Sequence, residues 1–340
     1  MVKLTSRAIR CFAFVFAATL SHAEESSMNK IALAVHGGAG TIERGSMTPE
    51  RENEYRAGIE NALRAGEKIL RGGGSALDAT EAAVRTLEDD PHFNAGKGAV
   101  FTSAGTNEMD AAIMDGKTLG AGAVAGVEHV RNPVTLARAV MEKSKHVFII
   151  GAGAEEFAKR NGIELVDAKY FFTQERWDDL KKAQGAEKSG RGGEKKFIIS
   201  EEEHHGTVGA VARDKDGNLA AATSTGGTTN KLPGRVGDSP VIGAGTYANN
   251  NTCAVSCTCD GEYFIRAAVA HEVCALIERG MSLREASEKA LARARELGGS
   301  GGLIAVDKNG EVALPFNTSG MYRGYVAADG KHVIDIYRER

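Results

Sequence analysis

At residues 205–212, HGTVGAVA, the sequence changes from polar to alternating apolar. This change constrains the fold of the chain more than any other feature of its sequence. Before it, residues 184–205 are rich in Gly, Lys and Glu, a composition typical of a mobile loop. After it, alternating apolar residues predict a strand at 208–213, followed by a turn at 214–218 and a second strand at 219–224. We therefore expect a buried hairpin whose first strand begins directly after an exposed linker.

Thr207 is the first residue of this strand. Because threonine is β-branched and favours the extended backbone, a purely structural role would account for it. A second interpretation is that the bond between Gly206 and Thr207 is cut, which would leave Thr207 with a free α-amine beside its own hydroxyl. An α-amine has a pKa of about 7.7–8.0, which suits a general base that works near neutral pH. Thr207 is thus a candidate nucleophile that carries its own base.

The remaining elements come in groups of strands and groups of helices. Strands are expected at residues 31–35, 99–102, 108–114, 146–150, 254–257, 262–265, 303–306 and 311–314. Helices are expected at residues 49–71, 75–87, 133–143, 154–160, 175–183, 266–279 and 283–296. The glycine-rich residues 36–40 are expected to form a turn after the first strand. Because strands and helices do not alternate strictly, the pattern favours a layered α+β architecture.

Charge and glycine content narrow the class of partner. The net charge is −3, which provides no basic footprint for nucleic acid. Glycine occurs 42 times and proline only 6 times, which indicates many tight turns and close backbone approaches. We therefore expect a small-molecule substrate bound among glycines, and no nucleic-acid partner.

The first 23 residues have the organisation of a secretory signal peptide. Lys3, Arg7 and Arg10 form a basic start, and an apolar run follows at residues 11–20. The sequence Ser-His-Ala at residues 21–23 fits a small-x-small cleavage site. Because the apolar run is too short to span a bilayer, we expect cleavage, no membrane anchor afterwards, and a mature protein in the periplasm or outside the cell.

The chain has five cysteines, of which the first would leave with the signal peptide. An oxidising compartment permits disulfides, but Cys257 and Cys259 lie in one expected strand, where a bond between them would be strained. No histidine pair completes a zinc-binding spacing. Buried free thiols are the expected state of Cys253, Cys257, Cys259 and Cys274.

Seven motifs in order along the chain carry a family resemblance. They are HGGAG at 36–40, NAG at 94–96, MDG at 114–116, the stretch HGTVGAVA, then ATSTGG through TNKLPGRVGDSPVIGAG at 222–245, GGSGGLIA at 298–305 and PFNT at 315–318. This set resembles the plant-type (type III) L-asparaginase/isoaspartyl peptidase family of N-terminal nucleophile hydrolases, over roughly residues 30 to 338. The resemblance implies a four-layer αββα sandwich and self-cleavage into an α subunit, residues 24–206, and a β subunit, residues 207–340.

The resemblance also implies an activity and an assembly. The cleaved chain would hydrolyse β-aspartyl dipeptides and L-asparagine with no catalytic cofactor, and its two subunits would form one catalytic domain. Two such pairs would associate as a dimer of heterodimers. The alternatives are glycosylasparaginase, which uses the same aspartyl anchor, and an inactive periplasmic amino-acid-binding relative.

Site residues follow from the same resemblance. Thr207 would attack the side-chain amide carbonyl, Thr225 would orient it, and the Thr258 hydroxyl with the Cys259 N–H would stabilise the oxyanion. The family usually has glycine at the position of Cys259, so a left-handed backbone there would be strained. The expected substrate-binding residues are Arg235 for the α-carboxylate, Asp238 and the Gly261 carbonyl for the ammonium, and Asn94.

The resemblance implies a structural sodium ion as well. Main-chain carbonyls of a compact loop would hold it, at Leu87, Glu88, Asp90, Phe93, Ala95 and Lys97. The histidines flanking the motifs, His36, His204 and His205, are expected to be structural or loop residues.

Overall fold

A computed structural model describes residues 30–188 and 206–338. The architecture is mixed α/β, with an eight-stranded sheet in the order β12-β11-β1-β5-β6-β2-β3-β4 and a four-stranded sheet in the order β10-β9-β8-β7. The strands are β1 (Ala32–Gly40), β2 (Met109–Asp115), β3 (Ala121–Val127), β4 (Phe148–Ile150), β5 (Val208–Arg213), β6 (Leu219–Thr225), β7 (Thr246–Ala248), β8 (Cys253–Cys259), β9 (Gly301–Asp307), β10 (Val312–Ala313), β11 (Gly320–Val326) and β12 (His332–Tyr337). The helices are α2 (Pro49–Arg71), α3 (Ala76–Glu88), α4 (Pro133–Lys143), α5 (Gly151–Arg160), α6 (Gln174–Lys188), α7 (Gly261–Ala267), α8 (Val269–Glu278) and α9 (Leu283–Glu296), with short 3-10 turns at Gly96–Gly98 and Ala168–Phe171.

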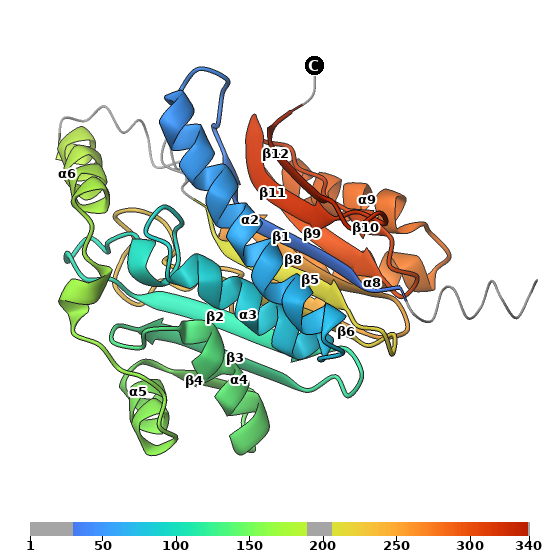
Figure 1. Cartoon of the computed structure of the whole chain (residues 1–340). Helices are drawn as coiled ribbons and strands as arrows, with labels where there is room; N and C mark the ends of the chain where they lie inside the picture. The colour runs from blue at the N-terminus through green and yellow to red at the C-terminus, as the bar shows by residue number, and fades with distance from the viewer. Residues whose placement is uncertain (1–29, 189–205, 339–340) are drawn as a thin grey trace, which may run out of the picture.

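Helices α2 and α3 lie across one face of the large sheet (Figure 1), with α4 against β2 and β3 at the end of that face. Thr48 accepts a hydrogen bond at the start of α2, ahead of Pro49 at the first helical position, as the sequence predicts. Ser75 caps α3 in the same way. The apolar faces of these helices bury a continuous cluster with the strands beneath them.

The small sheet packs on the other face of the large one. Its strands β8 and β9 contact β1, β5 and β6, and a cluster of alanine and larger apolar side chains fills the space between the sheets. Helices α8 and α9 cover the outer face of the small sheet. A capping box of Ser282 and Glu285 starts α9. The two sheets thus face each other, with helices on both outer sides.

The hairpin of β5 and β6 is confirmed, and its two strands pair antiparallel from Val208 opposite Ser224 to Arg213 opposite Leu219. The expected glycine-rich turn at residues 36–40 is wrong, because β1 continues to Gly40 and pairs with β11 there. Glycine suits this segment because Gly38 has φ +115 and lies directly against Gly206, where a Cβ would collide.

Two expected strands are absent from their positions. Residues 99–102 form only an isolated bridge, between Thr102 and Lys231, and the carbonyls of Ala99 and Val100 accept from Asn107 Nδ2 at 2.8 and 3.2 Å instead of joining a ladder. Residues 262–265 lie within α7, which begins at Gly261 and buries Phe264 completely. Tertiary packing there outweighs the strand preference of its aromatic residues.

The expected linker at residues 184–206 begins later than its composition indicates. Helix α6 runs to Lys188, so the first part of that segment is helical. Residues 189–205 lie outside the described residues, as does the expected signal peptide at 1–23. Within the described part of the chain, none of the helices combines the length and apolar character needed to cross a bilayer.

Candidate functional site

Two threonine side chains meet at one end of the large sheet. Thr207 stands directly before β5, and Thr225 ends β6, the strand that pairs with β5. The Thr207 Oγ1 donates a hydrogen bond to Thr225 Oγ1 at 3.0 Å, and both residues are buried. Their position at the end of a paired hairpin brings together two hydroxyls whose geometry the strands fix.

His36 holds Thr207 from the other side. The carbonyl oxygen of Thr207 lies 2.9 Å from His36 Nδ1, and Ser256 Oγ lies 2.9 Å from His36 Nε2. Burial lowers the pKa of His36 to about 3, although the bond to Thr207 opposes this shift. The ring is therefore neutral, and since a carbonyl only accepts, we assign the proton to Nδ1, so that Nε2 accepts from Ser256. His36 thus has a contact to the candidate nucleophile that its sequence position did not indicate.

Ser256 continues into a buried chain of hydroxyl groups between the two sheets. Its Oγ lies 2.7 Å from Thr223 Oγ1, which in turn accepts from Thr246 Oγ1 at 2.6 Å. Gly209 makes room for this chain, because a Cβ there would collide with Ser256 Oγ and His36 Nε2. Every member has a partner, as a buried polar network requires.

Thr258 and Cys259 end β8 close to the bond between Gly206 and Thr207. Thr258 Oγ1 accepts a hydrogen bond from the Ala39 N–H at 3.3 Å, next to Gly38, which lies against Gly206. Cys259 pairs with Gly301 as the last residue of an extended strand. Because an extended backbone suits any residue, the condition under which Cys259 would be strained, a left-handed backbone, does not apply here.

Arg235, Asp238 and Gly261 form a second, charged part of the site. The Arg235 guanidinium donates from Nε and Nη2 to the Glu262 carboxylate at 2.9 and 2.8 Å. Burial works to lower the pKa of Arg235, but Glu262, Asp238 and Asp110 outweigh it and raise that pKa. Gly261 begins α7 and packs on the Asp238 backbone, since a Cβ there would lie 2.9 Å from its nitrogen.

Asn94 connects the two parts. Its Nδ2 donates to the Gly227 carbonyl at 2.7 Å, and its Oδ1 accepts from the Val100 N–H at 3.0 Å. Gly227 in turn donates its N–H to Thr225 Oγ1 at 2.9 Å. In this structure the Asn94 amide therefore supports the turn that follows Thr225.

The loop that contains Asn94 is closed tightly on itself. A Cβ on Gly96, which has φ +51, would collide with the Glu88 carbonyl, and one on Gly98 would collide with the Phe93 carbonyl. The backbone of residues 87–97, which we call the carbonyl cradle, is thus tightly packed, and carbonyl oxygens are donors that suit a hard cation. The described ranges contain no group of three His, Cys, Asp or Glu side chains that could hold a metal ion.

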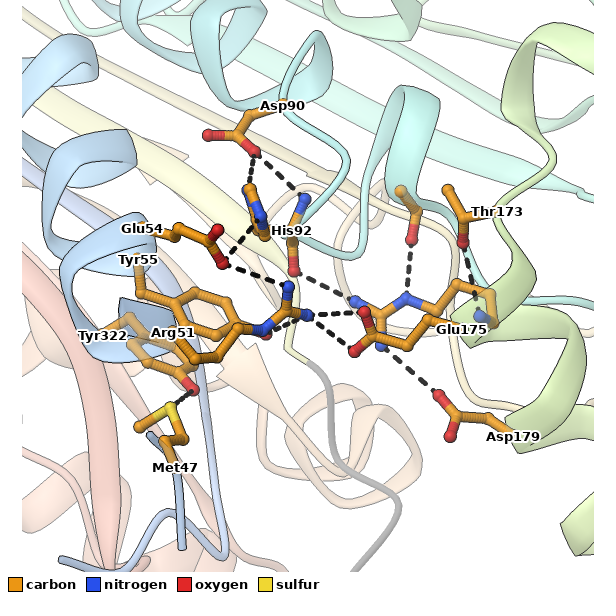
Figure 2. Close-up of polar contacts among 12 residues, drawn as sticks. Met47, Arg51, Glu54, Tyr55, Asp90, His92, Thr173, Glu175, Asp179 and Tyr322 are labelled. Carbon is orange, nitrogen blue, oxygen red and sulfur yellow. Dashed lines mark hydrogen bonds and ion pairs between the residues drawn. The ribbon is translucent and has the colours of Figure 1, made fainter. Parts of the chain in front are cut away.

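Helix α6 braces this loop from outside. The buried guanidinium of Arg176 donates to the carbonyls of Gly98 and His92 at 3.0 and 3.1 Å. Beside it, Glu175 accepts two hydrogen bonds from Arg51 Nη2 on α2 at 2.7 and 2.6 Å (Figure 2). The last described helix before the candidate cleavage site is therefore attached to both α2 and the loop.

Glu88 lies under the hairpin, on the side away from Thr225. Its Oε1 accepts from Ser224 Oγ at 2.6 Å and from the Val134 N–H at 3.0 Å. Burial raises the pKa of Glu88 to about 8, and these two bonds only partly oppose the shift. Cys253, Cys257 and Cys274 are buried free thiols, as expected, and the side chain of Cys259 lies outside the described atoms.

Two packed sheets with a buried, glycine-lined cluster of hydroxyls and charges at one end define an enzyme site. A family model described as asparaginase matches residues 29–336, so the chain belongs to the asparaginase family and is an amidohydrolase.

Individual relatives agree over almost their whole length. The isoaspartyl peptidase of Escherichia coli (strain K12) is 54% identical over 317 residues, covering 92% of this chain and 98% of the relative. The isoaspartyl peptidase of Salmonella typhimurium is 54% identical over 319 residues, covering 92% and 100%. The isoaspartyl peptidase/L-asparaginase of Homo sapiens is 43% identical over 305 residues, covering 89% and 95%.

Proposed function

We propose that this protein hydrolyses β-aspartyl dipeptides and L-asparagine after it has cut its own chain between Gly206 and Thr207. The hydrogen bond of 3.0 Å between Thr207 Oγ1 and Thr225 Oγ1 is the observation that carries the proposal. It gives Thr207 an oriented hydroxyl at a chain position where cleavage would free its amine. The names of the relatives, isoaspartyl peptidase and L-asparaginase, support the choice of substrates.

Self-cleavage begins with attack of Thr207 Oγ1 on the Gly206 carbonyl carbon. The peptide C–N bond breaks as the ester C–O bond forms, and the proton of the hydroxyl moves to the Thr207 nitrogen. Water then hydrolyses the ester, which leaves a carboxylate on Gly206 and a free α-amine on Thr207. The contact between Gly38 and Gly206 and the His36 bond to Thr207 support this step by fixing both sides of the bond.

Turnover uses the same hydroxyl on a different carbonyl. Thr207 Oγ1 attacks the β-carbonyl of the aspartyl unit, and the α-amine takes the hydroxyl proton and passes it to the leaving amine. The Thr258 hydroxyl and the Cys259 N–H stabilise the oxyanion. Water, activated by the same amine, then releases aspartate from the threonine ester.

Recognition of the aspartyl unit rests on its charged α end. Arg235 binds the α-carboxylate, while Asp238 and the Gly261 carbonyl bind the ammonium. Both residues lie beside Gly261 and their charges interact, which supports placing them in one charged site. Asn94 acts in substrate binding by supporting Gly227 and the turn after Thr225.

Several further properties complete the proposal. The layered arrangement is the four-layer αββα sandwich of N-terminal nucleophile hydrolases, in which residues 24–206 and 207–340 form one catalytic domain. The carbonyl cradle binds a structural sodium ion, and catalysis needs no other cofactor. The protein is exported by the signal peptide at 1–23, carries no membrane anchor afterwards, and works outside the cytoplasm as a dimer of cleaved pairs.

A denaturing gel and three substrates test the proposal. We expect the purified protein to run as two chains, and to hydrolyse β-Asp-Leu and asparagine. A glycosyl-asparagine should be a poor substrate; preferential hydrolysis of that compound would assign the protein as a glycosylasparaginase. A single intact chain without activity on any of the three would overturn the proposal and favour an inactive binding protein.

A further inference from the structure

Arg235, the expected anchor for the substrate carboxylate, already holds a carboxylate of the protein. A guanidinium presents two edges that can bind a carboxylate through two donors each, one formed by Nε and Nη2 and the other by Nη1 and Nη2. Glu262 occupies the first edge with both of its oxygens, at 2.9 and 2.8 Å. The second edge is therefore the one left to bind substrate in two-donor geometry.

Three glycines surround the guanidinium and fix where this second edge lies. A Cβ on Gly227 would stand 3.4 Å from Nη1, one on Gly237 would stand 3.0 Å from Nη1, and one on Gly261 would stand 3.1 Å from Nη2. Gly227 donates its N–H to Thr225 Oγ1 at 2.9 Å, and Thr225 accepts from Thr207. The second edge thus lies beside the turn that follows Thr225, and Gly227 and Gly237 have no side chain that would cover it.

Glu262 is itself held in its ionised form. Burial works to raise the pKa of its carboxyl, but the hydrogen bonds and charge of Arg235 outweigh that effect and lower the pKa. The Glu262 side chain is 36% exposed, whereas the Arg235 side chain is 16% exposed. The buried guanidinium therefore has a partner that stays charged. This ion pair offsets the desolvation energy of Arg235 and holds the guanidinium in one orientation.

We propose that Glu262 is a positioning residue for substrate: it binds the Nε–Nη2 edge of Arg235 and so commits the Nη1–Nη2 edge to the α-carboxylate of the aspartyl unit. The inference rests on the proposed function, because it assigns a partner to that site's anchor. Glu262 does not touch the substrate. It restricts the orientations of the Arg235 side chain before substrate binds, so less conformational entropy is lost on binding.

The test uses Glu262→Gln, which keeps the size and removes the charge, with Glu262→Asp as the conservative variant. Glu272→Gln is the matched control, because Glu272 also pairs with an arginine, Arg293, at 3.1 Å on helices away from the site. Self-cleavage on a gel, KM and kcat are measured with asparagine and with 3-aminopropanamide, which is asparagine without its α-carboxylate. Binding of aspartate and of β-alanine is measured by calorimetry.

We expect Glu262→Gln to self-cleave normally, to raise KM for asparagine about tenfold to a hundredfold, and to leave kcat within about threefold. Turnover of 3-aminopropanamide should stay unchanged, so the preference for the carboxylate shrinks. Glu262→Asp should recover part of the loss, and Glu272→Gln should behave as the wild type.

Equal losses on both substrates would assign Glu262 a merely structural role and overturn the inference. An unchanged KM or a lower KM would overturn it too, the latter by showing that Glu262 competes with substrate. Failure of the proposed function looks different: the wild type would hydrolyse neither amide. In that case, weaker aspartate binding with unchanged β-alanine binding in Glu262→Gln would still support the anchor, and unchanged aspartate binding would overturn it.

Discussion

The two faces of the large sheet use alternate residues of the same strands for different purposes. On the face covered by helices, β1 contributes Leu33 and Val35 to an extended cluster of apolar side chains. On the face toward the small sheet, the same strand contributes Ala32 and Ala34, and then His36. The first face is apolar in this cluster, whereas on the second face the apolar residues give way at one end to hydroxyls and an imidazole.

This difference shows how one sheet provides both stability and chemistry. The helix-covered face buries apolar area, which supplies most of the driving force for folding. On the opposite face, Ala32 and Ala34 are small and let the second sheet approach. The polar residues at the end of that face are tolerated because they hydrogen-bond to one another. Changes on the apolar face should therefore cost stability, while changes at the polar end should cost activity.

The strongest test of the polar face is Thr207→Ala. We expect a folded protein that remains one chain and hydrolyses neither β-Asp-Leu nor asparagine, because in the proposed mechanism one hydroxyl serves both reactions. A denaturing gel and an ammonia-release assay measure the two outcomes. Thr207→Ser is the matched control and should retain part of both activities. Cleavage or turnover by Thr207→Ala would break the assignment of chemistry to this face.

Arg235→Lys should separate substrate binding from self-cleavage. Lysine keeps the charge but lacks the planar fork, so we expect normal processing and a loss of about a hundredfold in kcat/KM on β-Asp-Leu. Steady-state kinetics on the cleaved variant measures the loss. Rates equal to those of the wild type would show that the carboxylate is bound elsewhere.

The polar face should also make stability depend on pH. The pKa of His36 is lowered from 6.5 to about 3 in the folded protein, so below pH 6.5 the unfolded chain takes up a proton that the folded protein does not. The free energy of unfolding should consequently fall as pH drops, by at most about 1.4 kcal/mol per pH unit, with no contribution above pH 6.5. Urea unfolding at pH 7.5 and 5.5 tests this for the wild type and for His36→Gln. The His36→Gln variant should lack this contribution of His36 to the pH dependence. An identical pH dependence in the wild type and the variant would contradict the prediction.

The apolar face is tested by Ile59→Ala on α2. Ile59 is fully buried against the sheet, so its truncation should lower the free energy of unfolding by about 2–5 kcal/mol. Ile59→Val should cost only about 0.5–1.5 kcal/mol. Self-cleavage and the kcat of the folded protein should be unchanged in both. A loss of kcat in Ile59→Ala without a loss of stability would contradict the assignment of stability to this face and activity to the other.

The smallest effect is expected for Cys259→Gly. Since Cys259 lies at the end of an extended strand and its N–H is common to both residues, the change should leave self-cleavage intact and alter kcat/KM by less than about threefold. Assays with and without reductant check this. A tenfold gain would show that the side chain obstructs substrate, and a tenfold loss would show that it contributes to the site.

Much of this fold could be predicted from local sequence signals. The capping residues Thr48 and Ser75 predicted two helix starts, and apolar alternation predicted the hairpin that begins after Thr207. Residues 262–265 were assigned wrongly, because a short aromatic run is compatible with either strand or helix.

The candidate site was only partly predictable. Its motif residues stand out in the sequence, but His36 and Glu262 become informative only through contacts that span 171 and 27 residues. Local sequence patterns do not indicate contacts between residues so far apart in the chain. The same holds for Arg176, a charged helix residue whose complete burial against the loop depends on how α6 docks.

The strand order of the large sheet has a consequence for the two halves of the chain. Strands β1 to β4 belong to residues before Thr207, whereas β5, β6, β11 and β12 belong to those after it. In the sheet they interleave, so that three hydrogen-bonded ladders, β11 with β1, β1 with β5 and β6 with β2, join one half to the other. A cut after Gly206 would therefore leave the two halves joined by these ladders, and only the small sheet, β7 to β10, lies wholly within one half. If the chain is cut as proposed, the large sheet has to form first, because its central strands come from both sides of the bond between Gly206 and Thr207.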